Sequence, residues 1–143
     1  MIAGETRHTL LKGENVYSDA SGFETAGRLL MVSFFLVAGL MNLTPARVKD
    51  HVDRMAGFGV PLPAAAFWTG MGIQFAGCAL LLADWHPDIG AWCLIVFTAV
   101  ANAIFHRFWM VQDPVRRNTT RLMLLNGIAI LGGLLLMLES VRG

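Results

Sequence analysis

Charged residues are scarce in this sequence. They make up 15% of the chain, against about 25% in an average soluble domain. The net charge is only +1, and no acidic or basic block stands out. The scarcity of charge argues against a soluble protein, and the balance of charge gives no indication of nucleic-acid binding.

Motifs that carry catalysis or hold cofactors are also missing. The sequence has no glycine-rich phosphate loop, no dinucleotide fingerprint and no nucleophile elbow. Its four histidines show no spacing typical of zinc or haem ligands. Cys78 and Cys93 flank one short turn, where they are either a redox pair or inert packing residues. We therefore expect no intrinsic cofactor and no bound metal.

Apolar residues, by contrast, make up 55% of the chain. They fall in four blocks, at residues 27–43, 64–83, 89–109 and 122–138. A membrane-spanning helix needs roughly 17–25 predominantly apolar residues, and each block meets this length. A soluble protein of 15.6 kDa has too little polar surface to cover four such helices. The sequence therefore predicts an all-α membrane protein, a bundle of four transmembrane helices.

Residues 1–26 differ from the rest, because they are polar and lack the apolar core of a cleavable signal peptide. We expect a short extension, partly disordered, before a membrane domain over residues 27–143.

The connection after the first block has a helical pattern. Thr44 can cap a helix that starts at Pro45 and ends at Gly57. Apolar residues recur at i, i+4 and i+7, at Val48, Val52 and Met55. This pattern predicts a short amphipathic helix in the membrane surface between spans one and two. A plain surface loop is the alternative.

The distribution of lysine and arginine predicts the orientation. With four spans, the first and third connections share a side, which holds Arg47, Lys49, Arg54, Arg107, Arg116, Arg117 and Arg121. The opposite side holds Arg7, Lys12, Arg28 and Arg142. The positive-inside rule places the first group in the cytoplasm and both termini outside, by a small margin.

Each span also carries one carboxamide: Asn42, Gln74, Asn102 and Asn126. Helical spacing groups them with other residues. Thr98, Asn102, His106 and Trp109 form one stripe of the third span; Gln74 shares a face with Gly70, Gly77 and Cys78, and Asn126 with Ala129 and Gly133. Small residues mark the faces on which helices pack in lipid, so we expect the carboxamides to point into the bundle and meet.

Two interpretations of this polar interior remain. The carboxamides either join the helices by hydrogen bonds or form a small polar pocket for a quinone, a lipid or a small redox substrate. His106 lies on the stripe and can donate, accept or titrate, whereas Arg107 is about 140° from Asn102 around the helix and can simply reach the headgroups. The ligand-binding candidates are Gln74, Asn102, His106, Arg107, Trp109 and Asn126.

The segments "GRLLMVSFFLVAGLMNL", "GFGVPLP", "GIQFAGCALLLA", "FHRFW" and "NGIAILGGLLLM" follow one another in an order and spacing that resemble the DoxX family. The resemblance covers residues 27–138, and "FHRFW" is its most specific part. It implies a four-helix protein of the bacterial inner membrane, in a family linked to quinone-coupled sulfur oxidation and to oxidoreductase complexes. The matching residues His106, Arg107, Phe108, Trp109 and Asn126 carry over as candidate site residues.

The chain departs from the family pattern at three ionisable positions. A lysine near the end of span one, a glutamate in span two and a lysine before the asparagine of span four are common there. Asn42, Gln74 and Leu125 stand here instead, which weakens a proton-coupled role.

Two functions from different classes follow. The chain is either the membrane subunit of a quinone-linked or sulfur-handling redox system, with an oxidoreductase partner protein, or a non-catalytic membrane anchor for other proteins. It has no redox centre of its own, which argues against a self-sufficient enzyme. The sequence leaves the substrate and any homo-oligomer undetermined.

Overall fold

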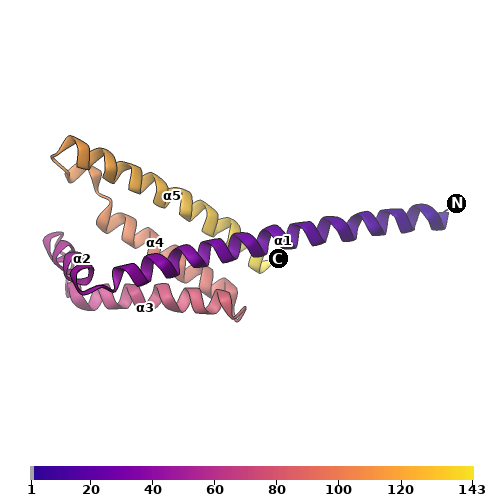
Figure 1. Cartoon of the computed structure of the whole chain (residues 1–143), viewed down its shortest axis with the longest axis horizontal. Helices are drawn as coiled ribbons and strands as arrows, with labels where there is room; N and C mark the ends of the chain where they lie inside the picture. The colour runs from indigo at the N-terminus through magenta and orange to yellow at the C-terminus, as the bar shows by residue number, and fades with distance from the viewer. Residues whose placement is uncertain (1) are drawn as a thin grey trace.

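The computed structural model describes residues 22–143, and within them it contains helices and turns but no strand. The elements, in chain order, are α1 (Ile2–Asn42), α2 (Pro45–Gly57), α3 (Pro63–Leu82), α4 (Pro87–Phe105), the short 3-10 helix η1 (Phe108–Met110) and α5 (Pro114–Arg142). The predicted polar extension, residues 1–26, falls largely outside the described residues. Helices α1, α3, α4 and α5 run lengthwise along the bundle, and α2 folds back at one end (Figure 1).

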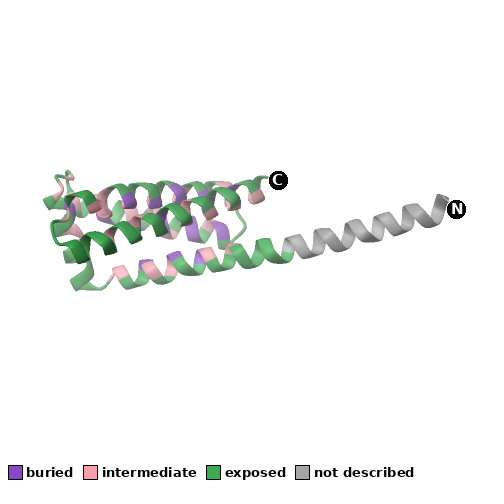
Figure 2. Cartoon of the chain, turned by 90° about the horizontal axis from the view of Figure 1, so that it is seen from above, coloured by how far each residue is buried: buried purple, intermediate pink, exposed green. Residues whose placement is uncertain are grey.

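Four helical segments are long and apolar enough to cross a membrane: Gly22–Asn42, Pro63–Leu82, Pro87–Met110 and Pro114–Arg142. This confirms the predicted all-α fold with four spans. Figure 2 shows the buried residues on the facing sides of these helices and exposed residues elsewhere. The exposed surface includes many large apolar side chains, such as Leu30, Val37, Val100 and Leu136. Such an outer surface suits lipid rather than water.

Four of the five prolines start helices, because proline fixes the backbone angle of the first turn and that turn needs no backbone donor. They are Pro45, Pro63, Pro87 and Pro114.

The start of α5 corrects the sequence prediction. The apolar block begins at Leu122, but the helix begins eight residues earlier, at Pro114. The connection after the third span is therefore shorter than residues 110–121, the gap between the apolar blocks. Asp113 is the N-cap, and its side chain accepts a hydrogen bond from the backbone N–H of Arg116 at 2.8 Å. This capping extends the helix into a polar segment, which hydropathy alone does not detect.

The predicted short helix between spans one and two is confirmed as α2. Thr44 is at the N-cap position, but its hydroxyl makes no cap hydrogen bond and donates to the carbonyl of Met41 at 3.5 Å. On the exposed face, Lys49 donates to Asp53 at 2.6 Å, and this hydrogen bond raises the pKa of Lys49. The opposite face packs on α3 through the buried side chain of Met55.

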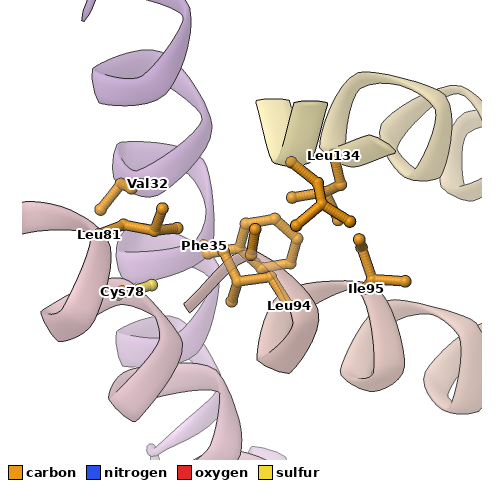
Figure 3. Close-up of a cluster of buried hydrophobic side chains, with 9 residues drawn as sticks. Val32, Phe35, Cys78, Leu81, Leu94, Ile95 and Leu134 are labelled. Atoms are coloured by element: carbon orange, nitrogen blue, oxygen red, sulfur yellow. The ribbon is translucent and has the colours of Figure 1, made fainter. Parts of the chain in front are cut away.

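The main core lies between the four long helices (Figure 3). It is built from Val32, Phe35, Cys78, Leu81, Ala91, Leu94, Ile95, Leu134 and Leu138. Helices α3 and α4 pack closely at Gly77 and Gly90: a Cβ added at Gly90 would lie 2.9 Å from the carbonyl oxygen of Gly77. Glycine at both positions lets the two backbones pack against each other.

Side-chain contacts place the connections at two opposite ends of the bundle. At one end, which we call the α2 end, Arg54 of α2 donates to the carbonyl of Phe105, the last residue of α4, at 3.4 Å. At the other end, Arg28 of α1 pairs with Asp84 of the α3–α4 turn at 2.7 Å. The first and third connections therefore lie at the same end, as predicted.

Candidate functional site

A pair of polar side chains, Asn102 and His106, lies where α4 ends. The Nδ1 atom of His106 is 2.7 Å from Oδ1 of Asn102, and the backbone N–H of His106 donates to the carbonyl of Asn102 at 3.1 Å. An amide oxygen only accepts, so this geometry selects the His106 tautomer with its proton on Nδ1. In the neutral imidazole the other ring nitrogen, Nε2, then carries a lone pair, and no described residue hydrogen-bonds to it.

The Asn102 side chain also holds an unused donor. Asn102 as a whole is 7% exposed, and its Nδ2 atom is buried without a hydrogen-bond partner among the described residues. The carboxamide packs directly against Gly127 of α5, where a Cβ would overlap it. A buried amide donor without a partner costs about 1–3 kcal/mol, so an acceptor atom that reached Nδ2 would remove this cost.

Two arginines cap the carboxyl end of α4. Arg107 donates through Nε to the carbonyl of Ala103 at 2.7 Å, and its guanidinium lies 5.4 Å from the ring centre of Phe58. Arg54 binds the Phe105 carbonyl and lies 5.1 Å from the centre of the Phe105 ring. Cations at a helix carboxyl end satisfy carbonyls that the helix leaves unbonded. Arg107 therefore has a helix-capping role here.

Because α4 ends at Phe105, the prediction that Trp109 continues the stripe of Asn102 and His106 is wrong. His106 leaves the helical conformation, and Trp109 belongs to the separate 3-10 helix η1. Trp109 is 62% exposed and packs edge-on against Phe108, with ring centres 5.3 Å apart. The spacing that joined Trp109 to Asn102 assumed a continuous helix, and the chain turns before reaching it.

Gln74 is buried, as predicted, but it lies between α3 and α1 and not beside Asn102 and His106. It is 1% exposed, and its Nε2 donates to the carbonyl of Phe35 in α1 at 2.6 Å. Its Oε1 is buried and unpartnered. No hydrogen bond joins Gln74 to Asn102 or His106 in the described part of the chain. Gln74 thus links α3 to α1, while Asn102 faces α5.

Asn126 does not point into the bundle, which corrects the prediction that all the carboxamides meet. It is exposed and forms no hydrogen bond with a described residue, and Ala129 on the same side is exposed too. The inward face of α5 is formed by Gly127, Leu134 and Leu138. Successive residues are rotated by about 100° around the axis of an α-helix. Because Gly127 faces the bundle, the preceding residue, Asn126, faces outward.

Sequence reasoning missed two participants, Gly127 and Arg54. The signal for Gly127 was present, since a glycine beside Asn126 allows a close approach that an asparagine does not. Arg54 was counted only among the basic residues of the connections, and its contact with α4 depends on how α2 folds back.

The described residues contain no group of His, Cys, Asp or Glu that could hold a metal ion. Cys78 and Cys93 are free thiols. The polar groups available at the end of α4 are thus hydrogen-bonding groups, the amide donor of Asn102 and the imidazole of His106, together with the positive charge of Arg54 nearby.

Fold and site together define a small helical membrane protein with a polar pair at one end of its third span. The chain belongs to the DoxX family, whose model matches residues 23–107, more than half of its length. This match includes His106 and Arg107 and ends before α5. No curated protein and no solved structure matches the chain.

Proposed function

We propose that this DoxX-family protein is the membrane subunit of a redox system and binds the polar head of a quinone at Asn102 and His106. The observation that carries the proposal is the buried, unpartnered Nδ2 donor of Asn102 beside the imidazole of His106. A carbonyl oxygen of a quinone would accept from Nδ2. The hydroxyl of the reduced quinol would donate to Nε2 of His106, which is an acceptor in the selected tautomer.

The surroundings support an apolar ligand with a polar head. The Asn102–His106 pair lies near the end of an apolar span, within reach of the lipid interior where a quinone tail dissolves. The sequence has no motif for a redox cofactor, and the proposal therefore includes an oxidoreductase partner protein through which electrons would pass. Its own residues would bind and orient the quinone head.

Thermal unfolding of the full-length protein in detergent, with and without a short-chain benzoquinone, tests this proposal. A ligand that binds only the folded state stabilises it by about 2.7 kcal/mol at a hundredfold excess over its Kd, so wild type should unfold at a higher temperature with quinone. Asn102→Ala and His106→Gln should lose most of this gain.

Asn126→Ala is the matched control, because it removes a carboxamide that is exposed and unbonded. It should keep the full quinone-dependent shift. If wild type shows no shift, the quinone proposal fails and the anchor function gains support. If Asn126→Ala loses the shift as fully as Asn102→Ala, the site has been placed on the wrong helix face.

We further propose that the α2 end faces the cytoplasm of a bacterial cell and that both termini lie outside its inner membrane. The excess of lysine and arginine in the connections at this end supports the orientation.

A further inference from the structure

A cavity of about 250 Å³ lies at the α2 end, between η1 and the first turns of α5. It is lined by Phe108, Pro114, Arg117, Asn118 and Arg121. None of these residues belongs to the Asn102–His106 pair. The cavity combines one aromatic wall with two guanidinium groups, a combination that suits an anion attached to an apolar body.

Hydrogen bonds hold both arginines of the cavity in place. Arg117 donates through Nε to the carbonyl of Val111 at 2.8 Å, and Arg121 donates through Nη2 to the side-chain oxygen of Asn118 at 2.9 Å. Each guanidinium has five N–H donors, so each keeps several for a ligand. A guanidinium held in this way binds phosphate with less loss of conformational freedom than a mobile one.

Among the described residues, no acidic side chain forms an ion pair with the arginines of the cavity. The ion pairs among the described residues are Arg28–Asp84, Lys49–Asp53 and Arg54–Asp50, and none involves Arg117 or Arg121. Asp113 is the only acidic residue between positions 106 and 121, and it accepts the backbone N–H of Arg116 at the helix cap.

The position of the cavity next to the apolar part of α5 favours a lipid phosphate over a soluble one. The apolar part of α5 begins at Leu122, directly after Arg121. Arg117 is about one helical turn, or 5.4 Å, further out, which corresponds to the headgroup layer. Trp109 is exposed in the adjoining η1, and tryptophan is enriched at this layer of membrane proteins.

We propose that this cavity is a binding site for the phosphate of an anionic phospholipid. Arg117 and Arg121 donate to the phosphate oxygens, the amide of Asn118 positions Arg121, and Phe108 contacts the apolar part of the lipid. The bound lipid connects the start of α5 to the headgroup layer.

The test is native mass spectrometry of the full-length protein with phosphatidylglycerol and phosphatidylcholine at equal concentrations. Wild type should retain phosphatidylglycerol preferentially. A hydrogen bond to a charged group contributes about tenfold or more to binding. Arg117→Gln/Arg121→Gln should therefore reduce the preference by about a hundredfold, and Arg121→Gln alone, which keeps the Arg117–Val111 hydrogen bond, by about tenfold.

Arg47→Gln/Arg116→Gln is the charge-matched control, since both arginines are exposed at the α2 end and neither lines the cavity. It should retain most of the preference. An equal loss in both double variants would show diffuse surface charge and overturn the site. Displacement of the lipid by an equal concentration of inorganic phosphate would assign the cavity to a soluble anion and overturn the lipid proposal. If the double variant unfolds, Arg121→Gln decides the question.

Discussion

The carboxamide of Asn102 in α4 occupies the space that a side chain at Gly127 in α5 would need. This contact orients the amide so that Oδ1 meets the ring of His106 while Nδ2 stays buried and unpartnered. The polar pair at the end of the third span therefore depends on a glycine in the fourth. Steric exclusion at the helix interface and hydrogen bonding at the site are two aspects of the same packing.

The first prediction tests this dependence with Gly127→Ala. The added methyl group must displace the amide of Asn102, so we expect a loss of about 1–3 kcal/mol in the free energy of unfolding. The hydrogen bond between Asn102 and His106 should be lost with it. Unfolding in detergent measures the first effect, and the nitrogen NMR shifts of the His106 ring measure the second.

Gly132→Ala is the control for that variant, because a Cβ at Gly132 would meet nothing within 4 Å. It should leave the protein unchanged or slightly more stable, since alanine favours the helix by about 1 kcal/mol. Equal destabilisation by both variants would contradict the specific contact.

The second prediction concerns the close packing of α3 and α4 at Gly77 and Gly90. In Gly90→Ala the new methyl group would lie 2.9 Å from the carbonyl oxygen of Gly77. A backbone oxygen cannot rotate away, so the helices must separate, and we expect unfolding to become easier by about 1–3 kcal/mol. Gly72→Ala, with nothing within 4 Å of its Cβ, should be nearly neutral. A stable Gly90→Ala protein would argue against this packing.

The third prediction separates structural hydrogen bonding from ligand binding at Gln74. Gln74→Leu keeps the volume and removes both the bond to the Phe35 carbonyl and the unpartnered Oε1. Hydrogen bonds between membrane helices average about 0.6 kcal/mol, so stability should change by less than about 1 kcal/mol. Gln74→Glu should be far more costly, because it buries an unpaired charge. The quinone-dependent shift should survive Gln74→Leu, and its loss would extend the site to α3.

The fourth prediction is topological. Cysteines introduced at Arg47 and at Arg116 should react with an impermeant thiol reagent from the same side of the membrane, and a cysteine at Asp88 from the opposite side. The wild-type protein is the control and should not be labelled, since Cys78 is fully buried and Cys93 lies within α4. In oriented vesicles, labelling of Arg47→Cys from the cytoplasmic side would support the proposed orientation. Labelling of the first two positions from opposite sides would rule out four spans.

Sequence patterns predicted much of the site but not its assembly. The burial of Gln74 and Asn102 followed from their helix faces, and the contact of Asn102 with His106 followed from their i, i+4 spacing. Trp109 was assigned to the same stripe wrongly, because spacing assumes that the helix continues. Asn126 was assigned inward wrongly, because a face rich in small residues can also be turned to lipid.

What the sequence by itself determined is the number of spans, the helix α2 and the end of the bundle at which the connections meet. These follow from local properties: an apolar run must be helical in lipid to satisfy its own backbone, and a proline at the first turn starts a helix. Only the tertiary structure decided which face of α5 turns inward, that Arg54 reaches the end of α4, and that Asn102 meets Gly127 rather than Asn126. Each of these depends on how closely two backbones approach, and that distance is set by all the side chains between them.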